Sequence, residues 1–245
     1  MANLAGATLI GQDLYEESST ALHRVGQLGV DTFGNRYRYV KNGAVALTTG
    51  NLLQEPAEDT QFNNMAVPAI EAIGQTEITV TNGTTAVTAN MFDGGLLFVS
   101  YSTGIGQTFR ILSHTTGASG ASITYTIDRP LKIALATTSK VTVRKNPYNG
   151  VIQSPVTTQT GGPVGVALYA MTISYYGWIQ SGGLCSVLAD TGTNFASTLG
   201  GVSPSVAVAG TVKPQDGSEG EAVIGVARNV SSTDSYMLAA HLFLD

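Results

Sequence analysis

A series of short apolar runs between Gly165 and Arg228 decides the fold. In chain order they are Gly165-Val166-Ala167-Leu168, Tyr176-Gly177-Trp178-Ile179-Gln180, Val187-Leu188-Ala189-Asp190, Gly210-Thr211-Val212 and Val223-Ile224-Gly225-Val226-Ala227-Arg228. Gly, Pro, Ser or Asn bounds each run, which is typical of short strands joined by turns. Trp178, the only Trp, lies inside one of them, and such a side chain usually anchors a half-buried strand. We therefore expect an all-β fold.

The composition favours a structural or binding module. Only 12% of the 245 residues are charged, about half of the usual share. Thr and Val favour strands, and frequent Gly favours turns. A folded chain with so few charges either has much of its surface covered by other subunits or carries a soluble surface of Ser, Thr and Gly.

Charge and Cys content exclude several classes of protein. The net charge is −5, and the twelve Lys and Arg form no long basic stripe, so we expect no nucleic-acid partner. The single Cys185 excludes a disulfide framework within the chain and a Cys-based zinc site. We expect no membrane association, because no apolar run approaches the length of a membrane span.

Changes in residue pattern along the chain predict a discontinuous main domain. Residues 1–28 read as an N-terminal arm or a short helix over 13–28, where Glu16 and Glu17 precede His23 and Arg24 as a helix dipole prefers. Residues 29–74 and 151–245 are expected to form a β-sandwich or barrel-like main domain. Residues 75–150 read as an inserted small β unit with its own turns.

Three hairpin signals stand out. In Arg36–Lys41, Tyr37 and Tyr39 alternate with basic residues, and this run lies between two of the signals, Gly34-Asn35 before it and Asn42-Gly43 after it. The alternation predicts a strand with one aromatic face and one basic face, which is either solvated or meets an acidic partner. The strongest signal joins residues 77–81 to 84–88 through Asn82-Gly83.

Asp190 is the only catalytic candidate. Val187-Leu188-Ala189-Asp190-Thr191-Gly192 matches the local signature of aspartic proteases, in which two Asp residues share a proton and activate water. With a single Asp-Thr-Gly, such an enzyme would have to dimerise. The alternative is that Asp190 caps backbone N–H groups at a turn, and we expect a non-enzymatic protein.

No metal or cofactor site is predicted. The acidic cluster Glu55, Glu58 and Asp59 lacks the alternating ligands and turn Gly of a Ca²⁺ loop. His23, His114 and His241 share no metal-ligand spacing.

A family resemblance adds to this reading. The opening Phe33-Gly34-Asn35-Arg36-Tyr37-Arg38-Tyr39-Val40, then Gly43–Leu47 and Gly50–Leu53, resembles small proteins of tailed-bacteriophage structural gene clusters. The succession of short apolar runs from Val164 to Ala227 is similar to that of capsid decoration, or cement, proteins. The middle block, with Arg129-Pro130-Leu131 and Asn146-Pro147-Tyr148-Asn149-Gly150-Val151, looks like an insertion seen in relatives from marine and cyanobacterial phages.

The resemblance implies a virion structural protein, made in the host cytoplasm, that binds the outer surface of the capsid. It also implies a homotrimer whose partner is the major capsid protein. The alternatives are a phage tail, fibre or receptor-binding component and, from another class, a dimeric aspartic protease using Asp190. As interface candidates we name, with monomer core as the alternative for each, Leu14, Leu22, Tyr37, Tyr39 and Trp178.

Overall fold

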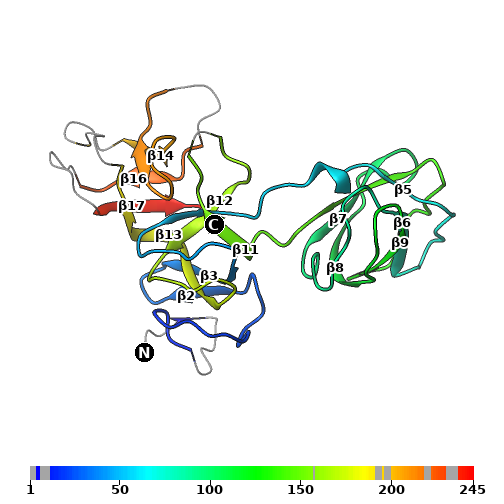
Figure 1. Cartoon of the computed structure of the whole chain (residues 1–245), viewed down its shortest axis with the longest axis horizontal. Helices are drawn as coiled ribbons and strands as arrows, with labels where there is room; N and C mark the ends of the chain where they lie inside the picture. Colours follow the sequence, from blue (N-terminus) through cyan, green and yellow to red (C-terminus); the bar gives the residue numbers. More distant parts are fainter. Residues whose placement is uncertain are drawn as a thin grey trace. The chain divides into compact units, whose positions relative to one another are not determined.

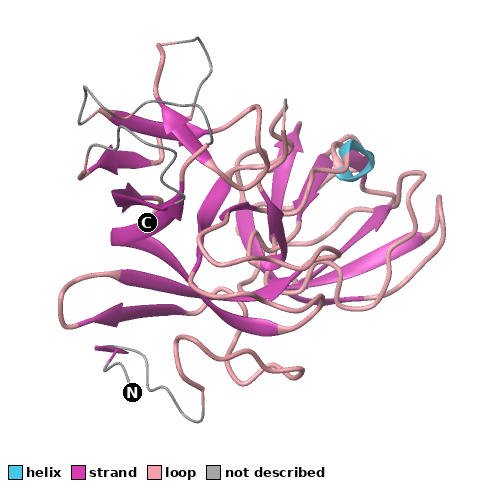
Figure 2. Ribbon diagram, turned by 60° about the vertical axis from the view of Figure 1, so that its left-hand side comes forward, coloured by secondary structure: helices cyan, strands magenta, loops and turns pink. Residues whose placement is uncertain are grey.

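The computed structural model describes residues 4–5, 12–156, 158–190, 195, 200–217, 222–229 and 237–245. The expected all-β fold is confirmed: strands dominate, and the one helix in these ranges is the short 3₁₀ turn η1 (Thr60–Phe62). Figure 2 shows this predominance of strands.

The chain divides into two compact units. Unit 1 consists of residues 1–57 and 147–245, and unit 2 of residues 58–146. The main domain is therefore discontinuous in sequence, and the inserted unit begins before the expected residue 75. It begins earlier because the stretch after Glu58 supplies η1 and a strand of the inserted sheet.

A ring of five strands forms the first half of unit 1. Its members, each paired with the next, are β3 (Arg36–Asn42), β11 (Asn149–Gln153), β4 (Leu52–Gln54), β12 (Pro163–Ala167) and β13 (Tyr176–Leu188). The additional pairing of β13 with β3 closes the ring, and only β3 and β11 run parallel. Val40, Leu53, Val151 and Ile179 are among the buried side chains of its core.

The second half of unit 1 continues from the far end of β13. There β13 pairs with β17 (Met237–Phe243), which is followed in the sheet by β16 (Gly225–Ala227), β14 (Gly201–Pro204) and β15 (Val212–Pro214). A bridge between Ala189 and Val212 brings β15 back to the end of β13. Val187, Val202, Leu238 and other apolar residues form a separate core here. The thirteen-residue β13 is thus shared by both halves (Figure 1).

Residues 12–27 form turns, bends and one isolated bridge, so the short helix expected over 13–28 is wrong. Local polar side chains compete for the backbone, since Asp13 accepts from the Tyr15 N–H and Ser18 from the Thr20 N–H. Ser18 also exchanges two backbone hydrogen bonds with Tyr176 on β13. Beyond this segment, β2 (Leu28–Asp31) pairs with β3 and with β1 (Leu4–Ala5).

Unit 2 is a closed antiparallel barrel of six strands. Around the barrel they are β10 (Lys140–Arg144), β5 (Met65–Ala66), β6 (Glu77–Thr81), β9 (Ser122–Ile127), β8 (Thr108–His114) and β7 (Leu96–Tyr101). Alternate residues point inward, as the buried Ile78 and Val80 of β6 and Ile123 and Tyr125 of β9 show. The barrel leaves no free sheet edge.

The hairpin expected between 77–81 and 84–88 is wrong. β6 pairs with β5 and β9, and residues 84–88 contribute one isolated bridge, between Val87 and Gly117. The Asn82 side chain explains the difference, because its amide donates to the carbonyls of Thr85 (2.7 Å) and Ala118 (3.1 Å). The Asn-Gly pair therefore directs the chain away from β6 instead of folding it back.

A similar Asn-Gly pair, with an Asn side chain that donates to backbone carbonyls, follows a strand in unit 1. Asn42-Gly43-Ala44-Val45-Ala46-Leu47-Thr48 and Asn82-Gly83-Thr84-Thr85-Ala86-Val87-Thr88 share Asn, Gly, Ala and Thr at matching positions. Asn42 donates to the carbonyls of Val45, Met171 and Thr172 (2.9–3.1 Å), and Leu47 forms an isolated bridge, as Val87 does. Both units thus use one sequence motif to leave a strand. The hairpin expected at Asn42-Gly43 is therefore wrong as well, because β3 pairs with β2, β11 and β13.

Candidate functional site

Four of the five interface candidates lie in one buried cluster of unit 1. Leu14, Tyr37, Tyr39 and Trp178 are all less than 7% exposed and pack together. The rings of Tyr39 and Trp178 are 5.2 Å apart, and the Tyr39 hydroxyl donates to Gln12 Oε1 (2.8 Å). Of the two readings of these four residues, the structure supports monomer core. Leu22 is 46% exposed and remains available to a partner.

His23 joins this cluster, which the sequence analysis did not foresee. Its ring lies 5.0 Å from that of Tyr39 and 5.2 Å from that of Trp178. Burial lowers the pKa of His23. Its position in an irregular segment gave no periodicity from which this contact could be predicted.

Asp190 is buried at the end of β13. Its Oδ2 accepts a hydrogen bond from the Ser205 hydroxyl, and Ser205 Oγ accepts in turn from the N–H groups of Ala207 and Val208 (3.0 and 3.2 Å). The carboxylate, on a residue 6% exposed, therefore holds the turn that follows β14. Thr191 and Gly192, the remainder of the protease-like tripeptide, lie outside the described residues.

The acidic cluster is divided among separate structural roles. Glu55 accepts from the Gly162 N–H (2.9 Å) in unit 1, Asp59 caps η1 through the Gln61 N–H, and Glu58 pairs with Arg144 in unit 2. Among the described residues, no group of three His, Cys, Asp or Glu could hold a metal ion.

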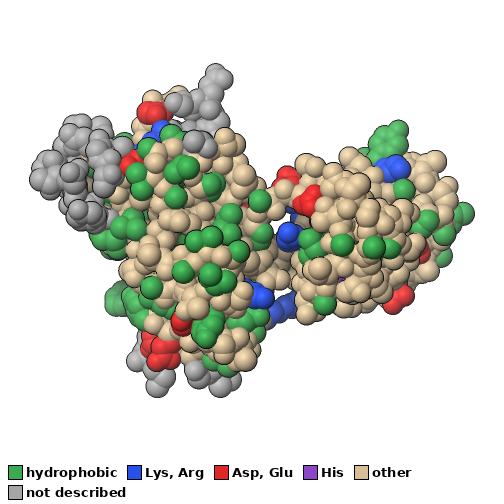
Figure 3. Space-filling view, viewed as in Figure 1, with side chains coloured by type: hydrophobic (Ala, Val, Ile, Leu, Met, Phe, Trp, Pro, Cys, Tyr) green, Lys and Arg blue, Asp and Glu red, His purple; other side chains and the backbone are tan. Residues whose placement is uncertain are grey.

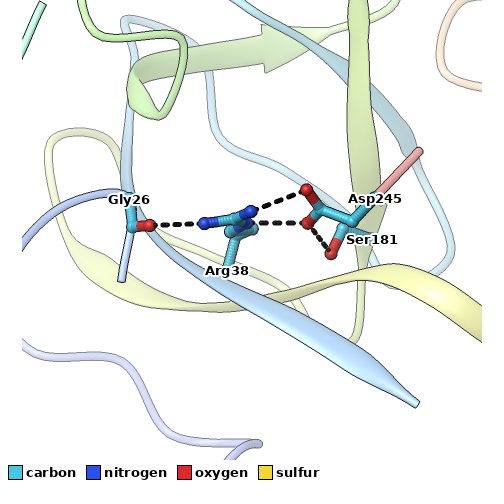
Figure 4. Close-up of polar contacts among 4 residues, drawn as sticks. All are labelled: Gly26, Arg38, Ser181 and Asp245. Carbon is cyan, nitrogen blue, oxygen red and sulfur yellow. Dashed lines mark hydrogen bonds and ion pairs between the residues drawn. The ribbon is translucent and has the colours of Figure 1, made fainter. Parts of the chain in front are cut away.

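Two of the three cations on β3 are engaged within the chain. Arg38 donates from Nε and Nη2 to the two carboxylate oxygens of Asp245 (2.7 Å each) and from Nη1 to the Gly26 carbonyl (2.9 Å), as Figure 4 shows. Lys41 lies 5.6 Å from the centre of the Tyr176 ring, a distance typical of a cation–π contact. The Arg36 side chain is exposed and makes no hydrogen bond or ion pair with any residue that the structure describes.

Asp245 is held by donors other than Arg36. Its Oδ2 also accepts from the Ser181 hydroxyl (2.6 Å; Figure 4). Burial opposes ionisation of Asp245, but hydrogen bonds from Arg38 and Ser181 outweigh it and hold its pKa below the ordinary value. Arg36 thus acts on this carboxylate only at longer range.

A pocket of about 680 Å³ lies beside Arg36, between the turn that precedes β3 and the end of β17. Gly182 on β13 pairs with both Arg36 of β3 and Phe243 of β17, so the two strands separate from this point. The walls of the pocket are Phe33, Gly34, Asn35, Arg36, Leu184, His241, Leu242, Phe243 and Asp245, and its floor is Gly182 and Gly183.

The turn that forms one wall is fixed by local hydrogen bonds. Asp31 Oδ1 accepts from the N–H groups of Phe33 and Asn35, and its Oδ2 accepts from the Asn35 amide (2.8–2.9 Å). Gly34 has φ +84°, a conformation for which Gly is preferred. The predicted Gly34-Asn35 hairpin signal is thus confirmed in the β2–β3 turn.

The floor depends on Gly183. It has φ +85°, and a Cβ there would lie 2.3 Å from Asn35 Oδ1, the atom that accepts from the Leu184 N–H (3.0 Å). A side chain at this position would therefore displace the contact between the floor and the turn. Sequence reasoning missed the pocket because Asn35 and Gly183 are far apart in the chain, and no local pattern brings them together.

The pocket combines exposed apolar surface with one cation. Phe33, Leu184 and Phe243 are 89%, 58% and 53% exposed, and they surround the exposed Arg36. Aromatic and aliphatic walls with a few polar groups are typical of binding sites. We therefore take this pocket as the candidate functional site.

Reactive groups elsewhere in the chain are buried. Burial raises the pKa of the Cys185 thiol to about 12, which keeps it protonated near neutral pH. The His114 side chain is inside the barrel of unit 2, where its Nε2 lies 3.1 Å from the Phe92 N–H that donates to it. Neither group lines the pocket.

Comparisons with protein-family models, curated proteins and solved structures found no match. Within the described ranges, no helix has the length and apolar character needed to cross a membrane.

Proposed function

We propose that this chain is a non-enzymatic virion structural protein that binds the outer surface of a phage capsid and stabilises the shell. The capsid assignment derives from the resemblance in residues 33–53 and 164–227. The observation that carries the binding role is the pocket beside β13, which joins exposed apolar side chains to Arg36, whose side chain has no hydrogen-bond or ion-pair partner among the described residues.

The construction of the chain also supports a binding role. Each unit has buried cores of its own, and unit 2 is a closed barrel. Even so, twenty large apolar side chains among the described residues remain exposed. Figure 3 shows how thinly charged groups are spread on the face that it draws. Exposed apolar side chains beside few charges suit a protein that adheres to a neighbour.

Shell stabilisation follows from mass action. A ligand that binds the assembled lattice more tightly than the free capsid subunits shifts the equilibrium toward the assembled state. Such a ligand needs a rigid body and a complementary surface, and it needs no catalytic group.

The decisive experiment is cosedimentation of the purified chain with empty heads assembled from the major capsid protein of the same phage. We expect saturable binding with hundreds of copies per head, and weaker binding to dissociated capsid subunits. Light scattering of the free chain should give the mass of a trimer.

Two results would contradict the proposal. Failure to sediment with the heads would remove the capsid as the partner. Saturation at a few copies per particle would instead indicate a tail or fibre component.

A further inference from the structure

We propose that the pocket beside β13 binds an extended peptide segment of another protein, in which a carboxylate side chain lies next to large apolar side chains. The pocket assignment goes beyond the capsid proposal and does not require it. If both hold, the segment belongs to the capsid surface.

Arg36 recognises the anionic group of the ligand. Because Arg38 and Lys41 are engaged within the chain, Arg36 is the one cation of β3 that has no partner among the described residues. Asp245, the nearest acidic wall residue, is held by Arg38 and Ser181. A guanidinium in this position matches a carboxylate, which it can bind through two parallel hydrogen bonds.

The walls supply the apolar half. Phe33, Leu184 and Phe243 come from the β2–β3 turn, β13 and β17, and all three are more than half exposed. Apolar side chains of a ligand would remove this surface from water. The Asp31 hydrogen bonds already fix the turn that carries Phe33, so binding would require little ordering of that wall.

The glycine floor leaves room for a peptide. Gly182 and Gly183 have no side chains to fill the pocket, whose volume of about 680 Å³ is in the range of ligand sites. A nucleic-acid backbone is a poorer match, because Arg36 is the one Lys or Arg among the described residues that line the pocket, and the chain has a net charge of −5.

The test uses the acetylated and amidated tripeptide Phe-Asp-Phe as the probe, and Phe-Asn-Phe as its uncharged control. Binding is followed by ¹⁵N amide shifts of the full chain. We expect the acidic tripeptide to shift the amides of Gly34, Gly183 and Leu184. It should bind about tenfold more tightly than its Asn control, as befits a charged hydrogen bond.

Two variants identify the group that is responsible. Arg36→Gln should abolish the difference in affinity between the two tripeptides. The amide spectrum of this variant should otherwise remain that of a folded chain. Arg24→Gln removes an exposed cation of the same unit outside the pocket and should preserve the difference. Phe243→Ser should weaken the binding of both tripeptides.

Equal affinity of the native chain for the two tripeptides would overturn the proposal, and so would shifts confined to residues outside the pocket. N-acetyl-aspartate binding as tightly as Phe-Asp-Phe would overturn the role of the apolar walls.

Cosedimentation of Arg36→Gln with heads separates this inference from the proposed function. If the variant still binds heads but no longer distinguishes the tripeptides, the pocket assignment stands and the capsid contact lies elsewhere. If the native chain distinguishes the tripeptides but does not bind heads, only the capsid proposal fails.

Discussion

At the scale of single residues, the Arg38–Asp245 pair is the most informative contact. Its side chains are only 23% and 14% exposed, and the carboxylate accepts three hydrogen bonds from Arg38 and Ser181. Partly buried pairs with such geometry contribute more than exposed pairs, whose contribution is near zero to 1 kcal/mol. Because Asp245 is held by this pair, Arg36 is the cation of β3 whose side chain has no hydrogen-bond or ion-pair partner among the described residues.

We expect Asp245→Asn to lower the free energy of unfolding by about 1–2 kcal/mol at pH 7, because charged hydrogen bonds are lost. The folded-state pKa of Asp245 is depressed. The ionised Asp245 therefore stabilises the folded chain above the pKa of an unfolded Asp, which is about 3.9. This contribution is lost as the pH falls through the lower pKa of the folded state. Denaturant unfolding between pH 7 and pH 2 would show the native chain and the variant converging in acid.

Asp216→Asn is the matched control, because it removes the more exposed partner of the Lys213–Asp216 pair. Its effect at pH 7 should be close to zero. If the free energies of unfolding of Asp245→Asn and the native chain differ by the same amount down to pH 2, the depressed pKa of Asp245 does not contribute to stability.

At the scale of elements, the shared Asn-Gly motif sets how two strands end. Asn42 and Asn82 are buried and donate to three and two carbonyls respectively. Removing such a donor leaves buried acceptors unpaired.

We expect Asn42→Ala to destabilise unit 1 by about 2–3 kcal/mol and Asn82→Ala to destabilise unit 2 by about 1–3 kcal/mol. Each effect should remain in its own unit, as measured by amide hydrogen exchange in β13 and in β9. Asn63→Ala, which removes one exposed hydrogen bond to Glu58, is the control. If either variant lowers the protection of amides from exchange in both units, the effect of the motif is not confined to the unit that contains it.

Local patterns predicted the strands better than their partners. The alternation in Arg36–Lys41 predicted β3 with Tyr37 and Tyr39 on one face, and both are buried. The pattern around Asn82-Gly83 predicted a hairpin, but a side-chain amide that bonds Ala118, a distant residue, overrides the turn preference. Likewise, the hydrogen bond from the Leu184 N–H to Asn35, which joins two walls of the pocket, is a contact that no periodicity encodes.

At the scale of the whole molecule, unit 2 is built to fold alone. Its sheet is closed, its core is continuous, and Glu58 near its start pairs with Arg144 near its end. The two points where the chain enters and leaves the barrel are therefore held together from within.

We expect residues 58–146, expressed alone, to give a dispersed ¹⁵N spectrum and a cooperative thermal transition. The reciprocal chain, with residues 57 and 147 joined by a short Gly-Ser linker, should keep unit 1 folded. Glu58→Gln in the excised barrel should lower its melting temperature, and Asp128→Asn on its surface is the control. A collapsed spectrum of the excised fragment would contradict the independence of the barrel.

The discontinuity of unit 1 has a consequence for synthesis on the ribosome. β3 and β4 are made before the barrel. β3 can pair with β2 at once, but its other partners, β11 and β13, and both partners of β4, β11 and β12, are made after the barrel. At ordinary translation speeds the delay is on the order of 10 s. During that time one edge of β3 and both edges of β4 have no partner strand, so chaperones that shield unpaired strands should bind the early part of this chain while translation continues.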